Sequence, residues 1–145
     1  MIDGFRLFVG YEKAYRSDHM LILPAKINGS SPKLFLMDTG SWDNTLSRAT
    51  AKENAKLHDE YGAVKVKGLS GEVNKVYTTG DVLLDFSNFK QQRTDMIAFD
   101  MTNTSNHAGI ELSGTLGFAM LFLFDIQIDY RDNLVKFGYD PYRLH

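Results

Sequence analysis

Asp38 is the residue of this 145-residue chain whose type and position most clearly suit chemistry. It follows an apolar run, residues 34–37, and is itself followed by Thr39, Gly40 and Ser41. An apolar run that comes after a turn-forming segment predicts a buried strand, so Asp38 should lie where that strand leaves the core. A carboxylate held near an apolar interior shifts its pKa or finds hydrogen-bond donors, and the hydroxyl groups beside it can serve. Asp38 is therefore a candidate acid or base.

The other polar residues give weaker signals. The chain has no cysteine, which excludes disulfides, thiolate chemistry and cysteine-type zinc sites. Four histidines occur without the spacing of metal ligands: His19, His58, His107 and His145. Ser70 and Ser113 lie near glycines but outside a Gly-x-Ser-x-Gly motif, which argues against a serine hydrolase. We expect neither a metal nor another cofactor.

The composition is that of an ordinary globular protein. The chain is 43% hydrophobic and 23% charged, with a formal net charge of −2, and its length predicts one domain. Nothing in the charge pattern indicates a nucleic-acid partner, and no apolar run is long enough to span a membrane. Charged residues interrupt the first twenty positions, so we expect no signal peptide in this chain. The sequence leaves the cellular location open. A location outside the cytoplasm would be compatible with the chain being a fragment of a longer precursor.

A β-hairpin is expected before Asp38, with Asp38 at the end of its second strand. Residues 20–27 form an apolar segment with Pro24 inside it, which is typical of an edge strand or a bulge. Asn28-Gly29 is the strongest hairpin signal in the chain, and it leads into the run at residues 34–37. Before this hairpin, residues 5–15 alternate apolar and other residues, as in a strand or an extended arm.

A helix and a second hairpin are expected next. Ser47 is a plausible N-cap for a short helix that runs to Leu57. Residues 63–67 and 73–79 are then predicted as strands, joined by the glycine-bounded segment 68–72. Glycines at both ends of a short connection favour a hairpin whose tip can move.

The remaining segments complete a chain of short strands. Residues 82–86 should pair with residues 94–99 through a turn at Ser87-Asn88, and residues 101–108 are polar and predicted as a loop. A glycine turn at residues 115–117 precedes a buried helical turn at residues 118–122, and a last hairpin joins residues 125–130 to residues 134–139. Many short strands with one or two short helices predict an all-β fold with a closed or folded sheet.

In order and spacing these segments resemble the retropepsin-like aspartic proteases, in their bacterial single-domain form. The resemblance covers about residues 20–138. It lies in the following segments: Ile27-Asn28-Gly29, Leu36-Met37-Asp38-Thr39-Gly40-Ser41, the hairpin tip Gly68 to Gly71, Gly114-Thr115-Leu116-Gly117, and the closing residues 124–137. It implies an acid-protease fold of folded β-sheets or a closed barrel. The expected domain is residues 20–140, with an N-terminal arm or linker at residues 1–19 and a tail at residues 141–145.

The resemblance also implies roles for individual residues. Asp38 would be the catalytic acid, Thr39 would reach across an interface between two subunits, and Gly40 would let substrate and water approach. Ser41 would support the catalytic loop and could bond the outer oxygen of Asp38. The flap over a bound peptide would consist of Gly68, Leu69, Ser70 and Gly71. Support beneath the loop would come from Thr115, Leu116 and Gly117.

The chain contains one Asp-Thr-Gly, and this bears on the mechanism. A single carboxylate catalyses peptide hydrolysis poorly, because one group must act as a base while another protonates the leaving group. Two carboxylates in one site do not both ionise cheaply, so one keeps a proton while the other activates water. The prediction is an aspartic endopeptidase with one Asp38 from each of two subunits, active on peptide or protein substrates at acid pH.

Two alternatives stay open. An inactive relative could keep the fold as a peptide-binding or dimerisation module, with Asp38 a capped acid at a strand end. The chain could also be one half of a tandem two-domain protease. It departs from the usual family pattern at Thr115, where an aliphatic residue is more common, and at Trp42 and Asp43 after the motif. Trp42 could be a packing residue or the wall of a substrate pocket.

Overall fold

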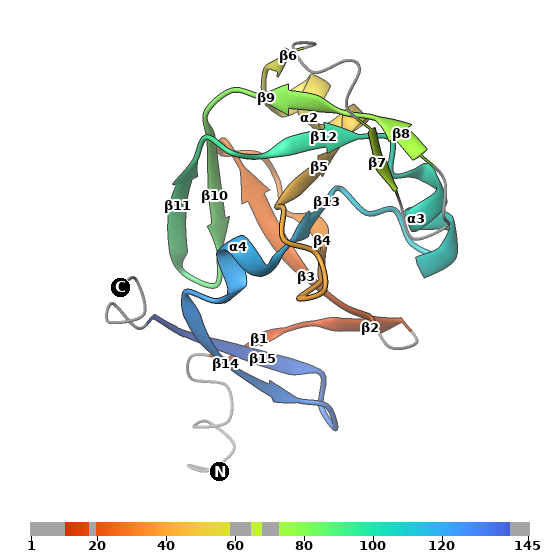
Figure 1. Cartoon of the computed structure of the whole chain (residues 1–145). Coiled ribbons are helices and arrows are strands. Elements are labelled where there is room, and N and C mark those ends of the chain that lie inside the picture. The colour runs from red at the N-terminus through yellow and green to blue at the C-terminus, as the bar shows by residue number, and fades with distance from the viewer. Residues whose placement is uncertain (1–10, 18–19, 59–64, 68–72, 140–145) are drawn as a thin grey trace.

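The computed structural model describes residues 11–17, 20–58, 65–67 and 73–139, and these are mostly short strands (Figure 1). The strands are β1 (Tyr11–Lys13), β2 (Tyr15–Ser17), β3 (Met20–Ile27), β4 (Lys33–Met37), β5 (Thr45–Ser47), β6 (Leu57–His58), β7 (Lys65–Lys67), β8 (Val73–Lys75), β9 (Tyr77–Thr79), β10 (Val82–Phe86), β11 (Phe89–Arg93), β12 (Ile97–Phe99), β13 (Gly114–Leu116), β14 (Phe124–Asp129) and β15 (Leu134–Tyr139). The helices are α2 (Arg48–Asn54), α3 (Thr102–Ala108) and α4 (Phe118–Leu121). The predicted all-β class is confirmed.

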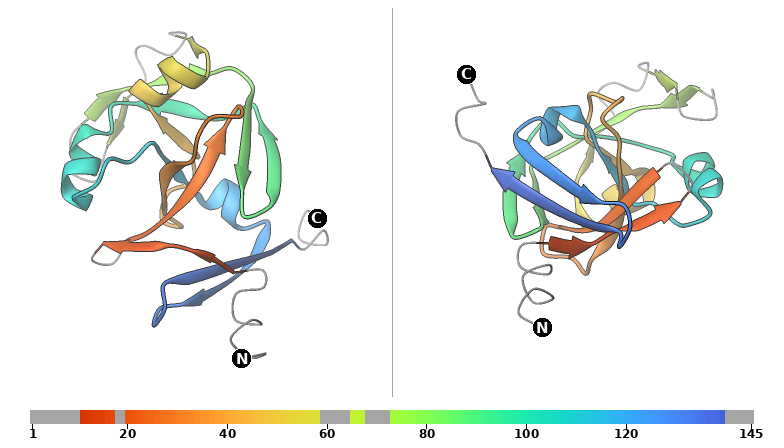
Figure 2. Two further views of the ribbon diagram at one scale, coloured as in Figure 1. Left: turned by 180° about the vertical axis from the view of Figure 1, so that it is seen from behind. Right: turned by 90° about the horizontal axis from the view of Figure 1, so that it is seen from below.

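The described strands form one large sheet and two small ones. The large sheet has the order β11-β10-β3-β4-β13-β5-β12-β9-β6, with β2 paired to β3. It curls around the core, and a separate sheet of order β1-β15-β14 lies beneath it (Figures 1 and 2). The strands β7 and β8 pair with each other. Part of the arm expected at residues 1–19 is therefore built into sheets, through β1 and β2, while the domain boundaries stay a prediction.

The hairpin of β3 and β4 forms as the sequence predicts. Asn28 and Gly29 both have positive φ angles, 50° and 76°, which suit a tight turn. The side chain of Asn28 also accepts a hydrogen bond from the backbone N–H of Leu83, at 2.8 Å. This bond fixes the hairpin against β10, the next strand of the large sheet.

Strand β13 lies between two segments that are far from it in the sequence. It runs parallel to β4 and antiparallel to β5. The approach is so close that a Cβ atom on Gly114 would lie 2.3 Å from the carbonyl oxygen of Thr45 and 2.4 Å from the ring of Phe35. Glycine is therefore required at this position, and the three strands form one packed unit around Phe35 and Leu116, both fully buried.

The predicted pairing of residues 82–86 with residues 94–99 is wrong. Strand β10 pairs with β11 instead, in a register that joins Val82 to Arg93. Ser87 and Asn88 have φ angles of 48° and 66°, so the turn closes within two residues and its partner strand must start at once. Strand β12 is thereby left to pair with β5 and β9.

Two helix predictions need correction. Residues 101–108 were expected as a loop but contain α3, whose C-cap Gly109 is left-handed with a φ angle of 73°. The Asp100 carboxylate accepts hydrogen bonds from the N–H and the hydroxyl of Thr102, and these local bonds outweigh the weak helix propensity of a polar segment. Ser47 does cap α2, but this helix ends at Asn54, short of the predicted Leu57.

Candidate active site

Asp38 follows β4 and is held by the neighbouring strand β13. Its backbone N–H donates to the carbonyl oxygen of Leu116 at 3.0 Å, which continues the parallel pairing of β4 with β13 by one residue. The side chain of Asp38 is half-buried, while Thr39 and Gly40 are exposed. The carboxylate therefore stands at the boundary between the core and the surface, as the sequence predicts.

The chain turns sharply after Asp38. The N–H of Gly40 donates to Oδ1 of Asp38 at 3.0 Å, and the N–H of Ser41 donates to its carbonyl oxygen at 3.3 Å. The sequence allowed a bond from the hydroxyl of Ser41 to the carboxylate; among the described residues, the donor to Oδ1 is the backbone N–H of Gly40. These bonds fix the orientation of the carboxylate relative to the loop of residues 38–41, which we call the catalytic loop.

Gly117 lies directly against this loop. A Cβ atom at this position would lie 2.2 Å from the carbonyl oxygen of Asp43 and 2.8 Å from that of Ser41, so no side chain fits. The next residue, Phe118, donates its N–H to the carbonyl oxygen of Ser41 at 2.7 Å. Thr115 and Leu116 are buried in β13, and Gly117 follows them, so this segment lies against the loop. Its role in supporting a catalytic loop stays a prediction.

Asn44 is a site residue that sequence reasoning missed. Its side chain is buried, and Oδ1 accepts the N–H of Gly117 at 2.8 Å. Its Nδ2 is buried without a hydrogen-bond partner among the described residues. In the sequence, Asn44 is only a polar residue between Asp43 and the start of β5. Nothing in the local pattern connects its side chain to Gly117, a glycine 73 positions later.

Trp42 lies on the surface beside the catalytic loop. It is 61% exposed, and its ring contacts those of Phe118 and Phe122, with centroids 5.9 Å and 6.2 Å away. Phe118 is the first residue of α4 and Phe122 is its C-cap, so Trp42 packs against this helix. Trp42 therefore packs against other aromatic rings at the surface, and a role as the wall of a substrate pocket stays a prediction.

The predicted flap, Gly68 to Gly71, lies outside the described residues. The strands that flank it are described: β7 and β8 pair antiparallel, with Lys67 opposite Val73. This arrangement agrees with the predicted hairpin, whose second arm divides into β8 and β9. The flap role of the tip stays a prediction.

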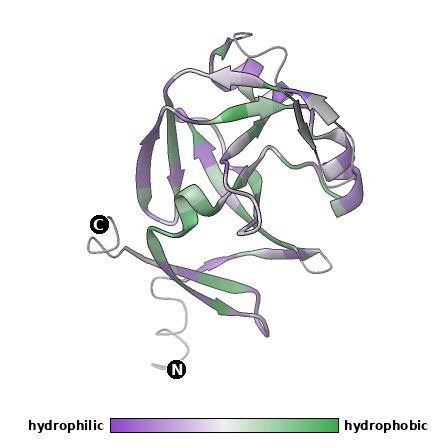
Figure 3. Cartoon of the chain, viewed as in Figure 1, coloured by the Kyte–Doolittle hydropathy of each residue, from purple (hydrophilic) through white to green (hydrophobic). Residues whose placement is uncertain are grey.

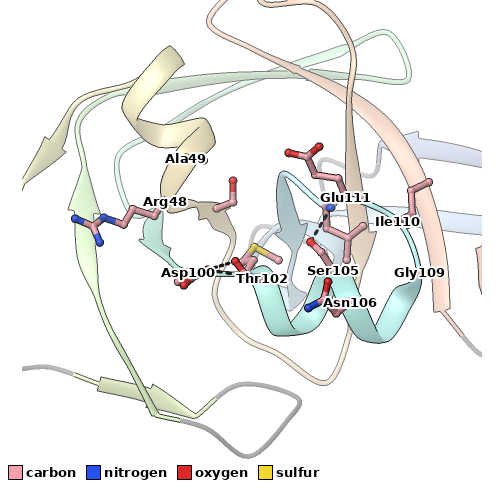
Figure 4. A pocket seen from close by; sticks show the side chains of 12 residues that line it. Arg48, Ala49, Asp100, Thr102, Ser105, Asn106, Gly109, Ile110 and Glu111 are labelled. Atoms are coloured by element: carbon pink, nitrogen blue, oxygen red, sulfur yellow. Dashed lines mark hydrogen bonds between the residues drawn. The ribbon is translucent and has the colours of Figure 1, made fainter.

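The described residues hold no group of three or more potential metal-binding side chains. No described helix has the length and apolar character needed to cross a membrane. A cavity of about 560 Å³ lies away from Asp38, between α2, the end of β12 and α3 (Figure 4). At its edge, hydrogen bonds from Thr102, aided by the charge of Arg48, lower the pKa of the Asp100 carboxyl below its ordinary value.

Comparison with known proteins agrees with this geometry. Residues 23–119 match the family model described as aspartyl protease, so the chain belongs to the aspartyl protease family. A search of curated proteins found no match.

Two solved structures share the fold. A retropepsin-like aspartic protease from Rickettsia conorii is 19% identical, with a TM-score of 0.54, over 90% of this chain and 91% of that one. The EIAV protease, complexed with the inhibitor HBY-793, is 20% identical, with a TM-score of 0.52, over 74% of this chain and 89% of that one. The fold is therefore retropepsin-like.

Proposed function

We propose that this chain is an aspartic endopeptidase whose active site forms between two copies, each of which contributes Asp38. The proposal rests on the observation that Asp38 and its loop are held in place by hydrogen bonds and close packing. The carboxylate projects from a loop that is bonded to β13 and closed from below by Gly117. A structural acid at a strand end does not need this support, whereas a catalytic acid must be held close to its working geometry.

The need for a second copy follows from the chemistry. In the proposed mechanism, one Asp38 is ionised and takes a proton from a water molecule, whose oxygen attacks the peptide carbonyl carbon. The other Asp38 is protonated and gives its proton to the carbonyl oxygen. Collapse of the tetrahedral intermediate then breaks the C–N bond. The first carboxyl gives its proton to the leaving nitrogen, while the second, now ionised, takes a proton back from a hydroxyl of the intermediate, so that the carboxylic acid product forms and the starting protonation states return.

The other site residues have supporting roles in this proposal. Thr39, exposed at the loop, would contact the partner loop and hold the two carboxylates together. Gly40 would leave room for substrate and water. An extended peptide would lie between the loops and the hairpin that β7 and β8 begin, paired through its backbone in the manner of an added strand. The tip at residues 68–71 would close over it.

Peptide cleavage tests the proposal. Wild-type protein and Asp38→Asn are incubated with a mixed peptide library between pH 3 and 7, and products are identified by mass spectrometry. We expect the wild type to cut with an optimum on the acid side, and Asp38→Asn to lose activity by at least about 100-fold. Asn is nearly isosteric, so circular dichroism should show the same fold.

Asp43→Asn is the matched control, because Asp43 is an exposed acid close by in the chain. It should retain the activity of the wild type. The proposal fails if Asp38→Asn cuts as well as the wild type, or if a folded wild-type dimer cuts no peptide. Peptide capture without turnover, unchanged by Asp38→Asn, would favour a binding module instead.

A further inference from the structure

A row of hydrogen bonds joins residues 116–119 to the segment of residues 38–44, which contains the catalytic loop. The four bonds run from the N–H of Asp38 to the carbonyl oxygen of Leu116 (3.0 Å), from the N–H of Gly117 to Oδ1 of Asn44 (2.8 Å), from the N–H of Phe118 to the carbonyl oxygen of Ser41 (2.7 Å) and from the N–H of Ala119 to that of Trp42 (3.0 Å). Each of four consecutive residues therefore holds one point of the segment that carries Asp38.

Asn44 differs from the other partners in this row. Its bond to Gly117 is made by a side chain, whereas the other three bonds join backbone groups. A substitution at those other positions, except by proline, leaves the backbone N–H and carbonyl groups in place. Asn44 is thus the position in the row where the identity of the side chain decides whether a bond forms.

The side chain of Asn44 also contains a donor that is not satisfied. The residue is buried, and its Nδ2 has no hydrogen-bond partner among the described residues. The segment opposite is apolar: Leu116 and Met120 are fully buried, and α4 is coloured as hydrophobic in Figure 3. A buried donor without an acceptor destabilises the folded state, and an apolar side chain would avoid this cost. Stability by itself therefore does not explain an amide at this position.

The orientation of the amide follows from its bond to Gly117. If the amide were turned over, Nδ2 would face the N–H of Gly117, and two donors would meet. Oδ1 must therefore point to Gly117, which leaves Nδ2 without an acceptor. Unsatisfied buried groups are rare in folded proteins, and departures of this kind are expected at functional sites.

We propose that Asn44 is a positioning residue for Asp38. Its Oδ1 holds Gly117, and with it residues 116–119, where they fix the catalytic loop. Asn44 is buried and acts through Gly117, without contact to a substrate. The inference rests on the proposed function, because a loop needs close positioning only if its carboxylate does chemistry.

Loss of this bond should lower kcat much more than it changes KM. Without it, residues 116–119 can shift relative to the loop, and Asp38 occupies a wider range of positions. The transition state depends more steeply on the position of catalytic groups than substrate binding does. We therefore expect kcat to fall by about 10- to 100-fold in Asn44→Ala, with KM within about twofold of the wild type. The assays are run well above the dimer dissociation constant, which sedimentation checks.

The pH profile measures the same effect in a second way. Two carboxylates that share a site ionise at separate apparent pKa values because they lie close together. A looser loop weakens this interaction, so the two limbs of the bell-shaped profile should move towards each other in Asn44→Ala. A residue that only stabilised the fold would leave the shape of the profile unchanged.

Two further variants sharpen the test. Asn44→Asp keeps an oxygen at the position of Oδ1, and burial keeps its carboxyl neutral at acid pH, so it should recover most of the lost kcat. Ser105→Ala is the matched control, because the Ser105 hydroxyl also accepts a backbone N–H, that of Leu112 at 2.9 Å, beside the cavity away from Asp38. It should lower the thermal midpoint at least as much as Asn44→Ala, which also removes the unpaired Nδ2, and leave kcat and the pH profile unchanged.

Hydrogen exchange tests the inference without any activity. Amide exchange is followed by NMR in an Asp38→Asn background, which prevents self-cleavage. In Asn44→Ala the amides of Phe118 and Ala119 should exchange at least about tenfold faster, because their bonds to the loop open more often. The amide of Leu84, a fully buried residue of β10, should change no more than it does in Ser105→Ala.

The outcomes separate this inference from the proposed function. Unchanged exchange at Phe118 and Ala119 overturns the positioning role, and so does an active Asn44→Ala whose kcat stays within twofold of the wild type. An Asn44→Asp no better than Asn44→Ala, or an equal loss of kcat in Ser105→Ala, would also overturn it. If exchange accelerates as expected but the wild type cuts no peptide, the role of Asn44 in holding the loop stands and the catalytic proposal fails.

Discussion

Gly117 shows how a single residue can hold a candidate active site together. Its backbone passes so close to residues 41–43 that a Cβ atom would lie 2.2 Å from the carbonyl oxygen of Asp43. Its N–H is satisfied by the buried side chain of Asn44. The close approach and the hydrogen bond together place the support segment directly against the catalytic loop. Neither feature depends on a second copy of the chain.

We therefore expect Gly117→Ala to be costly even in the monomer. The new methyl group cannot be accommodated against backbone atoms without moving the loop, which should lower the free energy of unfolding by about 1–3 kcal/mol. Gly138→Ala is the control, because a Cβ atom there would lie 3.8 Å from its nearest neighbour, an ordinary contact. Urea denaturation measures both variants. Equal stability of the two would contradict the support role of Gly117.

At the scale of elements, α3 shows that a polar segment predicted as a loop can form a short helix. The segment lacks an apolar stripe, and its buried side chains are those of Thr104 and Ala108. Asp100 supplies what the propensity does not, by accepting two hydrogen bonds from Thr102 at the start of the helix. These bonds lower the pKa of the Asp100 carboxyl from its ordinary value of 3.8, with a smaller contribution from the charge of Arg48. The ionised form is therefore the one that stabilises the fold.

The pH dependence follows from the direction of this shift. Because the folded pKa of Asp100 is below the unfolded value, its stabilisation is present above pH 3.8 and is lost as the pH falls through the folded pKa. Asp100 is exposed, so the effect should be small, about 0.5 kcal/mol for Asp100→Ala at pH 7. Chemical denaturation between pH 2 and 7 would show this difference shrink towards low pH.

Asp100→Asn is the control, because its side-chain oxygen can still accept both bonds but carries no charge. Its stability relative to Asp100→Ala should not change with pH. If the difference between the wild type and Asp100→Ala instead grew as the pH fell, the assignment of the shift to Thr102 would be wrong.

At the scale of the whole molecule, the size of a cavity in a single chain is a poor guide to this site. The cavity of about 560 Å³ in Figure 4 lies away from Asp38, whereas a groove of about 380 Å³ touches the catalytic loop through Thr39. A cleft that forms between two subunits has only one wall in each of them. The position of Asp38 therefore carries more weight here than the size of any cavity.

Mixing of subunits tests the shared site directly. Wild-type protein is equilibrated with a ninefold excess of Asp38→Asn, at a concentration well above the dimer dissociation constant. If random pairing puts most wild-type subunits into dimers with one Asp38, activity should fall to about a tenth of that of the wild type alone. The same excess of an unrelated protein should have no effect. Undiminished activity would mean that each chain works alone or pairs with a different domain.

The sequence alone determined the class of the fold and the identity of the candidate acid. An apolar run that ends in Asp-Thr-Gly, and a turn at Asn28-Gly29, are local patterns whose physical meaning needs no distant partner. The helix cap at Ser47 was equally readable, because the bond from the N–H of Thr50 spans three residues.

The tertiary structure decided what these local patterns are packed against. The insertion of β13 between β4 and β5, the bond from Gly117 to Asn44, and the contact of Trp42 with Phe118 all join segments separated by many tens of residues. Such contacts depend on how sheets close around a shared core, and periodicity within a short window carries no information about them. Asp38 was visible in the sequence, whereas the bonds that hold its loop against residues 116–119 came from the fold.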